Sequence, residues 1–568
     1  MSVGNLGAPL AASQRFSARL THLAGTPAFW IAAFVLAAAA ALSLPLRLPL
    51  GPNAWDTAVY LDAVQRIRMG QVPSLDFFAP VGPLGYYGAA LLDALFPRAQ
   101  PMLLANWALL PVLLPMLTLL CAPIAARSRL MALGLLLPFL LFASLPINLH
   151  GLYPMPGFDG YGHYNRHVAL LLYLLIATLL FVQDRRLTTR MVAVLMLTLF
   201  LVKITGAVTG ALMVGYAVLA GRLRLRDAVA AAVLVLGTLG ALDLATGLVR
   251  AYVADILALL ALNTGALLPR FLTVASVKFN VVGPCLLLLG ALALAAWRQG
   301  IALSLDGLRM LLASNLGWLA AALVALTFFE TQNTGSLEYI GLWPILLLIL
   351  LDWRQRQDAL KPAVLVLALA VSLPSAVIFV ERSVRAMLGA VGHVALDAPE
   401  LGPLGRVSLK LDMAARAAGM LEHYATQQAS YRELARRDLP PSYILYSEID
   451  YQATWLFEVR QGVNAIGAWE AANGRTLNGF LTLDFVDPFN HLLDRMPPRH
   501  VPIGMDPGRS TPALEQNTLA ELARTDALLA PKCPLTTARD AISSHFEEAL
   551  RGRKRVALSS CWDMYLRN

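Results

Sequence analysis

The chain has 568 residues, of which 57% are hydrophobic and only 14% charged, and its mean hydropathy is +0.61. These values exclude an ordinary soluble protein and predict a membrane domain built from several helices. The formal net charge of +9 comes mainly from arginine in short loops. The positive-inside rule predicts such loops, so the basic balance needs no nucleic-acid partner.

The N-terminal segment, Met1–Thr26, is a short tail before the first apolar run. No small-residue cleavage site follows that run, so we expect a retained anchor rather than a removed signal peptide. A helix crosses the bilayer core with about 20 apolar residues. The sequence predicts about 11 spans, several of them short. The predicted spans are Pro27–Leu46, Met102–Ala126, Leu130–Leu149, Val168–Val182, Met191–Val202, Ile204–Leu219, Ala228–Val249, Ser276–Trp297, Met310–Phe329, Ile340–Leu351 and Pro362–Val380.

Loop charges set the predicted orientation. With a cytoplasmic N-terminus, each loop assigned to the inside is short and carries arginine or lysine, as the positive-inside rule requires. The loops assigned to the outside are mostly longer and rich in aromatic residues, glycine and proline. An odd number of spans then places the C-terminal part of the chain outside. Leu84–Phe96 is a further apolar segment, which we interpret as a surface helix.

The most distinctive stretch is the first outer loop, which follows the first span. Ala54–Met69 is predicted to be a helix, with Asn53 as its N-cap and Gly70 as its end. Asp56 would then lie at the third helical position. There a carboxylate stabilises the helix start, and the helix end would lower its pKa. A structural capping role for Asp56 therefore stands beside a catalytic one.

The predicted alternation of inside and outside loops also places three other polar segments on the outside, namely His150–His167, Arg250–Phe271 and Glu330–Tyr339. Lys203 separates two short apolar runs, where a charge requires a partner or water. An acid, several bases and aromatic rings on one face are typical of an active site at the membrane surface. The alternative is that these residues are only the solvated ends of spans.

From residue 381 the composition becomes that of a soluble protein, which predicts a membrane domain over 1–380 and a soluble domain over 381–568. Ser383–Val391, Met413–Arg437 and Thr518–Arg524 are predicted helices, and three short apolar runs are predicted strands of an α/β domain. The three runs are 443–446, 527–530 and 556–559. This domain either braces the outer loops or binds the acceptor.

The four cysteines divide into two groups. Cys533 and Cys561 lie in the predicted external domain, so a disulfide between them is a reasonable hypothesis. Cys121 and Cys285 lie in predicted spans, where we interpret them as small apolar side chains.

The first-loop pattern WDTAVYLDAVQRIRMGQVPSLDFFAPVGPLGYY resembles the first outer loop of the GT-C superfamily of membrane glycosyltransferases. That superfamily includes protein O-mannosyltransferases and the transferases that attach aminoarabinose to lipid A. The matching features are Asp56 just after the first span and Gly82-Pro83-Leu84 followed by two tyrosines. Tyr164-Asn165-Arg166 and Gln332-Asn333 resemble further family features. The resemblance covers roughly the membrane half and implies a GT-C fold.

One departure from the family pattern concerns metal binding. Many members have two adjacent acids, whereas Thr57 follows Asp56 here. We therefore assign no cofactor and no metal ligand, and a divalent metal stays an open alternative.

Outside the cytoplasm no nucleotide sugar is available, so the expected donor is a sugar on a polyprenyl phosphate. Its transfer requires a base for the acceptor hydroxyl and cations for the leaving phosphate. Asp56 is the candidate base. Arg166, His163 and Lys203 are the candidates for the phosphate, Arg166 foremost because its fork can pair two oxygens.

Several other side chains are candidates for substrate contact. Tyr60, one helical turn from Asp56, and Tyr86 could stack on a sugar. Glu330 is a candidate for the acceptor or lipid-phosphate region, with Asn165 and Asn333 beside it. Asp62 and Asp76 are the remaining acids of the first loop, and Asp76 is counted among the substrate-contact candidates. The complete set of substrate-contact candidates is Tyr60, Asp76, Tyr86, Asn165, Glu330 and Asn333.

Two weaker patterns have ordinary explanations. Asp159 stands between glycines and is interpreted as a turn residue. A metal site could be suggested by His150, His163 and His167. However, no cysteine lies near them in the sequence, and Asp159 is the only nearby acid. Solvated loop histidines are therefore the preferred interpretation.

The sequence therefore predicts an inverting glycosyltransferase with a polyprenyl-phosphate donor and a lipid, glycan or protein acceptor. It would act on the outer face of a bacterial inner membrane, with the N-terminus cytoplasmic and the C-terminal domain periplasmic. The alternative is a transporter or flippase for a lipid-linked glycan. That function would favour inverted repeats and paired charges near mid-bilayer. The sequence has no clear repeat, and its charges gather on one side.

Overall fold

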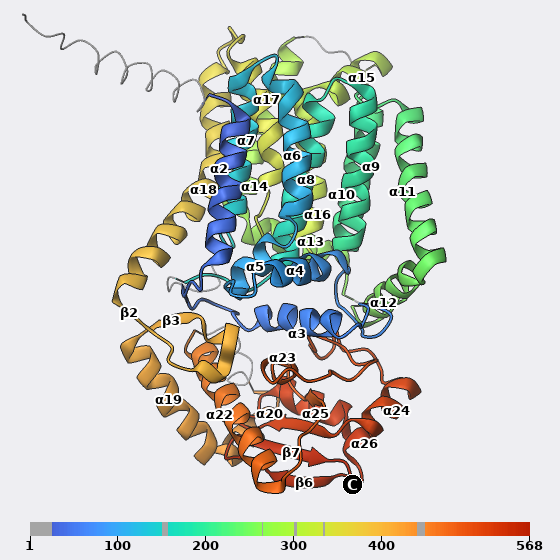
Figure 1. Ribbon diagram of the computed structural model, residues 1–568. Coiled ribbons are helices and arrows are strands. Elements are labelled where there is room, and N and C mark those ends of the chain that lie inside the picture. The colour runs from blue at the N-terminus through green and yellow to red at the C-terminus, as the bar shows by residue number, and fades with distance from the viewer. Residues whose placement is uncertain (1–24, 150–156, 264, 300–303, 333–334, 440–448) are drawn as a thin grey trace, which may run out of the picture.

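The computed structural model describes residues 25–149, 157–263, 265–299, 304–332, 335–439 and 449–568. Figure 1 shows a long bundle of helices above a smaller mixed domain, with helices α3, α4 and α5 lying across the end of the bundle between them. Three predicted features fall outside the described residues: His150, Asn333 and the predicted strand over 443–446.

The bundle and the helices at its end account for the first two thirds of the chain. In chain order they are α2 (Pro27–Ser43), α3 (Asp56–Arg68), α4 (Leu84–Leu95), α5 (Pro101–Trp107), α6 (Leu110–Ala125), α7 (Arg129–Ser144), α8 (His163–Phe181), α9 (Arg185–Val202), α10 (Ile204–Leu219), α11 (Leu225–Thr246), α12 (Leu248–Leu262), α13 (Leu267–Val277), α14 (Phe279–Arg298), α15 (Leu305–Ala313), α16 (Asn315–Glu330), η1 (Ile340–Leu342), α17 (Trp343–Trp353) and α18 (Lys361–Gly389).

Each predicted span overlaps one of these helices. By length and composition, four of the described helices can cross a membrane: α8, α11, α14 and α18, the last counted with the short turn after it. The number rises to seven if each bent pair of helices forms one span, and shorter apolar helices such as α2, α7, α10 and α17 accompany them. The segment Leu84–Phe96, predicted as a surface helix, forms α4 and lies across the bundle end (Figure 1).

Within the bundle, α8 is the central helix. All but one of its 19 residues are buried, although its first turns carry histidine, asparagine and arginine. By contrast, α11 is apolar and mostly exposed, which is the pattern of a helix that faces lipid. The polar start of α8 therefore lies at a protected position where the bundle meets the smaller domain.

The smaller domain follows α18, the last helix of the bundle. Its elements are η2 (Ala390–Gly392), β2 (His393–Ala395), η3 (Pro399–Gly405), β3 (Val407–Lys410), α19 (Leu411–Thr426), α20 (Gln428–Arg436), α22 (Ile449–Asn473), β4 (Phe480–Thr482), α23 (Phe489–Leu492), α24 (Gln516–Arg524), β5 (Ala527–Pro531), α25 (Thr537–His545), α26 (Glu547–Leu550), β6 (Lys554–Ala557) and β7 (Trp562–Leu566).

Two sheets organise this domain. The first has the order β1-β3-β2, and its strand β1 (Leu48–Pro49) comes from the first outer loop and pairs in parallel with β3. The second has the order β4-β5-β7-β6, with β4 and β5 parallel and the other neighbours antiparallel. In β5, Leu528 and Leu529 point to opposite faces and both are buried, so helices cover the sheet on both sides.

Two helices predicted for this region are present with different bounds. Ser383–Val391 is not a separate helix, because α18 continues from the bundle to Gly389. The domain boundary predicted at residue 380 therefore falls inside a helix. Met413–Arg437 is also not one helix, since the chain breaks at Gln427 between α19 and α20. The predicted strands at 527–530 and 556–559 coincide with β5 and overlap β6.

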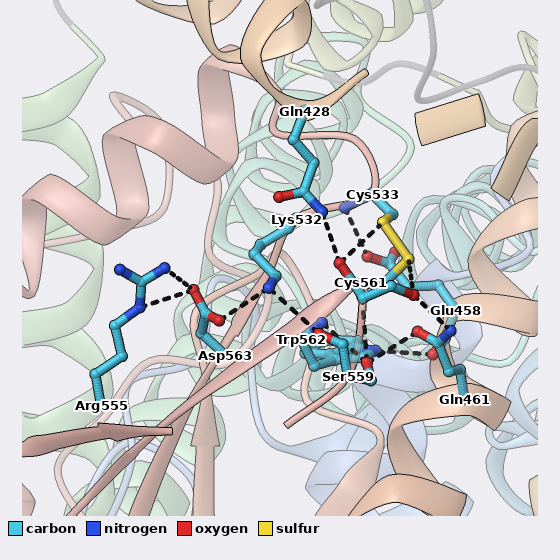
Figure 2. Close-up of polar contacts among 11 residues, drawn as sticks. Gln428, Glu458, Gln461, Lys532, Cys533, Arg555, Ser559, Cys561, Trp562 and Asp563 are labelled. Atoms are coloured by element: carbon cyan, nitrogen blue, oxygen red, sulfur yellow. Dashed lines mark hydrogen bonds and ion pairs between the residues drawn. A yellow bond between two sulfur atoms is a disulfide. The ribbon is translucent and has the colours of Figure 1, made fainter. Parts of the chain in front are cut away.

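Cys533 and Cys561 form a disulfide in the structure, with their Cα atoms 5.1 Å apart. The bond joins the segment after β5 to the residue before β7 (Figure 2). Beside it, the Cys533 backbone N–H donates to the buried Glu458 carboxylate at 3.2 Å. The same carboxylate is paired with Arg539 at 2.8 Å, so the disulfide adjoins a buried ion pair.

Candidate functional site

A cavity of about 650 Å³ lies where the helix bundle meets the smaller domain. Its wall combines the start of α3, the first turn of α4, the start of α8, the junction of α9 and α10, the helices α12 and α13, the end of α16 and a loop of the C-terminal domain. Six predicted site residues line it: Asp56, Tyr60, Tyr86, His163, Lys203 and Glu330.

Asp56 is the first residue of α3, and Trp55 is the N-cap. The expectation that Asn53 caps the helix and that Asp56 occupies its third position is therefore wrong. Asn53 has a positive φ of 50° and belongs to the preceding turn. The Trp55 backbone N–H donates to the Gln452 side chain at 2.9 Å, although these residues are 397 positions apart. The smaller domain therefore helps to fix the start of the helix that carries Asp56.

The Asp56 carboxyl group is shielded from bulk solvent, and burial raises its pKa from 3.8 to about 7. The nearby Asp506 carboxylate raises the pKa further, while Arg509, Arg166 and a hydrogen bond from the Gly162 backbone lower it. The sequence-based expectation that the helix end would lower this pKa is wrong, because desolvation is the largest effect and outweighs the groups that lower the pKa. A carboxyl group with a pKa near 7 is well matched to general-base catalysis at neutral pH.

Gly162 holds the loop before α8 against Asp56. Its φ is +68°, and a Cβ at this position would lie only 2.6 Å from the Gly335 carbonyl oxygen. Glycine tolerates both conditions, whereas any side chain would require the backbone to move. The close approach of two loops therefore depends on a residue without a side chain.

Aromatic rings form the wall beside the carboxylate. The Tyr60 ring lies 5.2 Å from that of Tyr86 and 5.3 Å from that of His163, measured between centroids. Burial raises the pKa of both tyrosine phenols, so they remain protonated hydrogen-bond donors. Flat rings with a polar edge beside an acid suit the binding of a sugar, which presents apolar C–H groups and hydroxyls.

Three cationic side chains line the same cavity: Lys203, Arg270 and Arg509. The Lys203 ammonium group donates to the Asn165 side chain at 3.0 Å and to the Gln332 carbonyl at 3.1 Å, and it lies over the Tyr164 ring. Asn165 thus acts on the cavity indirectly, by holding Lys203.

Glu330 is another acid of the cavity wall, and its side chain is buried. Both of its carboxylate oxygens accept hydrogen bonds from the Ser336 hydroxyl at 3.0 Å. This contact fixes the carboxylate at the end of α16, where it lines the cavity.

Arg166, the residue expected to be the main phosphate ligand, is not among the residues that line the cavity. It is 1% exposed, and its guanidinium group donates to the side chains of Asn106 and Asn148 at 3.0 and 2.8 Å. It also donates to the Tyr161 carbonyl at 3.0 Å and to Nδ1 of His163 at 2.6 Å. With its donors engaged inside the protein, Arg166 holds the loop before α8 and the adjoining helices together.

Three further acids, of which Asp76 was a predicted site residue, have structural roles. Asp76 does not line the cavity, because its carboxylate accepts from the Val72 backbone at 2.8 Å and pairs with Arg499 at 3.1 Å. Asp62 is buried and paired with Arg66 at 2.9 Å. Asp159 accepts from the Asn148 backbone at 2.9 Å, and burial raises its pKa to about 6.

Among the described residues, no group of three or more metal-ligating side chains is assembled. His163 and His167 are both buried, so the expectation of solvated loop histidines is wrong for these two. Nε2 of His167 instead contacts the Asn106 carbonyl at 2.9 Å.

Sequence reasoning missed the contribution of the C-terminal domain to the cavity, which comprises Phe485, Gly504, Asp506, Arg509 and Ser510. The segment IGMDPGRS has a recognisable turn composition with two charges. That signal gives the local shape but not the position of the loop against α3. The segment Arg250–Phe271 was predicted to lie on the outer face, but Arg270 was not among the predicted site residues.

Comparison with known proteins adds little. No protein-family model and no curated protein matches the chain. Two crystal structures of ArnT from Cupriavidus metallidurans, one apo and one bound to undecaprenyl phosphate, align with 95% of this chain and 98% of theirs. Their sequence identities are 13% and 12%, and both TM-scores are 0.38. A TM-score this low carries no argument about function.

Proposed function

We propose that this protein is an integral-membrane glycosyltransferase that moves a sugar from a polyprenyl-phosphate donor to a lipid, glycan or protein acceptor. The observation that carries the proposal is the position of Asp56. It is a carboxyl group with a pKa of about 7, in a cavity lined by cations and aromatic rings at one end of an apolar helix bundle.

In this proposal Asp56 removes the proton from the acceptor hydroxyl as that oxygen attacks the anomeric carbon of the donor. The bond between that carbon and the phosphate oxygen breaks, and the electron pair leaves with the polyprenyl phosphate. Attack from the face opposite the phosphate inverts the anomeric centre. The proton ends on Asp56 and returns to solvent before the next cycle.

The leaving phosphate requires positive charge, because its negative charge grows as the bond breaks. Lys203 and Arg270 reach the cavity from the bundle side, and both can hold phosphate oxygens. His163 remains a candidate hydrogen-bond donor, since it also lines the cavity.

An apolar path for the lipid tail adjoins these charges. The cavity wall includes Ile256, Leu259 and Leu260 of α12 and Val274 of α13. The axes of these two helices meet at an angle of 85°. A tail that leaves the cavity between them would pass from the polar site to the lipid-facing side of the bundle. This arrangement supports a lipid-linked donor.

The competing transporter hypothesis is less well supported. A flippase needs a polar path near mid-bilayer, with paired charges or interrupted helices in both halves. Here the charged cavity residues gather where the bundle meets the smaller domain, and that domain supplies part of the wall. We further propose that this end of the bundle faces the periplasm and that the N-terminus is cytoplasmic.

Glycan and lipid profiling of cells tests the proposal. Cells carrying Asp56→Asn are compared with wild type, with a deletion strain and with cells carrying Asp306→Asn, a change at an exposed acid on α15. We expect Asp56→Asn to reproduce the deletion profile at normal protein level and Asp306→Asn to resemble wild type. A wild-type profile for Asp56→Asn would contradict its assignment as the base.

A further inference from the structure

A loop of the C-terminal domain, residues 503–510, reaches the same cavity as Asp56. The Ile503 backbone N–H donates to the Phe78 carbonyl of the first outer loop at 3.1 Å. Gly504 has a φ of +62°, and a Cβ there would lie 3.6 Å from the Val59 side chain, about one turn along α3 from Asp56. The loop therefore lies directly on the helix that carries the proposed base.

The loop also has a fixed internal shape. The Ser510 hydroxyl donates to the Gly504 carbonyl at 2.5 Å and accepts from the Asp506 backbone N–H at 3.0 Å. On the membrane side, the Asn263 side chain at the end of α12 donates to the Arg509 carbonyl at 3.3 Å. These contacts hold Arg509 at a defined place between the two parts of the protein.

The Arg509 guanidinium group can exchange its present carboxylate partner for another anion. Its side chain is 64% exposed and pairs with Asp506 at 3.2 Å, three residues earlier in the same loop. An exposed pair of this kind contributes little net stability, so a stronger anion can replace its carboxylate partner. Phosphate is such an anion, because it offers several oxygens to the planar guanidinium fork.

Arg509 lines the same cavity as Asp56. It lies close enough to Asp56, Lys203 and Tyr164 to influence each of them electrostatically. It is the cation that the C-terminal domain contributes, whereas Lys203 and Arg270 come from the bundle. An anion bound between these groups would contact both parts of the protein at once.

We propose that Arg509 binds a substrate phosphate group in this cavity, so that the C-terminal domain forms part of the substrate site and is more than a brace. The inference rests on the proposed function, in which one substrate carries a phosphate. The phosphate belongs either to the lipid-linked donor or to a phosphorylated acceptor, and both present the same chemistry to the guanidinium group. Asp506 serves as the counterion of Arg509 when no phosphate is bound.

Equilibrium binding to the full-length protein in nanodiscs tests this proposal. The probes are undecaprenyl phosphate, the corresponding polyprenol without phosphate, and inorganic phosphate. We expect Arg509→Ala to weaken undecaprenyl phosphate binding about 10-fold or more, with polyprenol binding unchanged and Arg509→Lys intermediate. Arg551→Ala is the matched control, because Arg551, just after α26, is 72% exposed and pairs with Glu547, four residues earlier.

The outcomes separate the two proposals. If wild type binds undecaprenyl phosphate and Arg509→Ala binds it and inorganic phosphate equally well, Arg509 is no phosphate ligand, while the proposed function stands. Wild type could instead bind inorganic phosphate through Arg509 without binding the lipid phosphate. Arg509 would then be a phosphate ligand for a phosphorylated acceptor, and the proposed lipid-linked donor would be wrong. Failure of wild type to bind either phosphate would contradict both.

Discussion

Arg166 donates a hydrogen bond to Nδ1 of His163 at 2.6 Å, one helical turn apart at the start of α8. Arginine has no acceptor, so the imidazole must accept at Nδ1, and a neutral ring then carries its proton on Nε2. The contact fixes both the orientation and the tautomer of a ring that lines the cavity. Arg166 thus positions a residue of the cavity wall without lining the cavity itself.

Replacing Arg166 should therefore damage folding before it affects substrate binding. Arg166→Ala leaves buried amide and carbonyl oxygens without their donors, and we expect a loss of about 3–5 kcal/mol in unfolding free energy. Thermal unfolding in nanodiscs measures this loss, with Arg186→Ala on the exposed start of α9 as control. A stable Arg166→Lys protein that fails only to bind phosphate would restore Arg166 as a ligand.

Activity should rise with pH through the Asp56 titration. A general base acts in its ionised form, and the pKa of Asp56 is about 7, so the rate is expected to climb between about pH 6 and 8 and then level off. A pH profile of kcat/KM with a polyprenyl-phosphate sugar measures this. A profile that is flat across neutral pH would show that ionisation of Asp56 does not limit the reaction.

Asp56→Asn should also stabilise the protein at alkaline pH. The folded-state pKa of Asp56 is raised above the value of 3.8 expected when unfolded, so ionisation favours the unfolded state. The contribution of Asp56 to stability therefore falls as the pH rises from about 4 to about 7 and is constant above that. We expect the variant to be more stable by about 1–3 kcal/mol at pH 8 and equal to wild type near pH 4. Equal unfolding temperatures at pH 8 would contradict the raised pKa.

Arg66 couples α3 to the C-terminal domain. It is fully buried, pairs with Asp62 at 2.9 Å and donates to the Pro498 carbonyl at 2.7 Å. Arg66→Ala leaves a buried carboxylate unpaired, and we expect a loss of about 3–5 kcal/mol in unfolding free energy.

Arg68→Ala provides a control for this variant, two residues along the same helix at an exposed position. Adding Asp62→Asn to Arg66→Ala should recover part of the lost stability, because no unpaired charge then remains. Similar unfolding temperatures for Arg66→Ala and Arg68→Ala would show that this contact does not stabilise the interface.

The Cys533–Cys561 bond closes a loop with a sequence separation of 28. Closing a loop of this length restricts the unfolded chain, and removing the bond should lower stability by about 3 kcal/mol.

We expect Cys533→Ala and Cys561→Ala each to abolish the mobility difference between reducing and non-reducing gels. Cys121→Ala, at a buried thiol in the bundle, should retain that difference.

Local patterns in the sequence determined the membrane domain, the surface position of α4 and the candidacy of Asp56. Apolar runs form helices in a bilayer whatever their neighbours are, because unpaired backbone groups are too costly there. The alternation of basic and non-basic loops placed Tyr60, Tyr86, His163, Lys203 and Glu330 on the same outer side of the membrane.

Tertiary structure alone decided the raised pKa of Asp56, the internal contacts of Arg166 and the position of Arg509 in the cavity. The pKa depends on desolvation by segments distant in the chain, and the helix-end argument that sequence permits gave the opposite direction. Arg166 looked like a phosphate ligand because a sequence cannot show which donors are already engaged. Contacts between residues far apart along the chain, such as Trp55 with Gln452, are set by packing and leave no local signal.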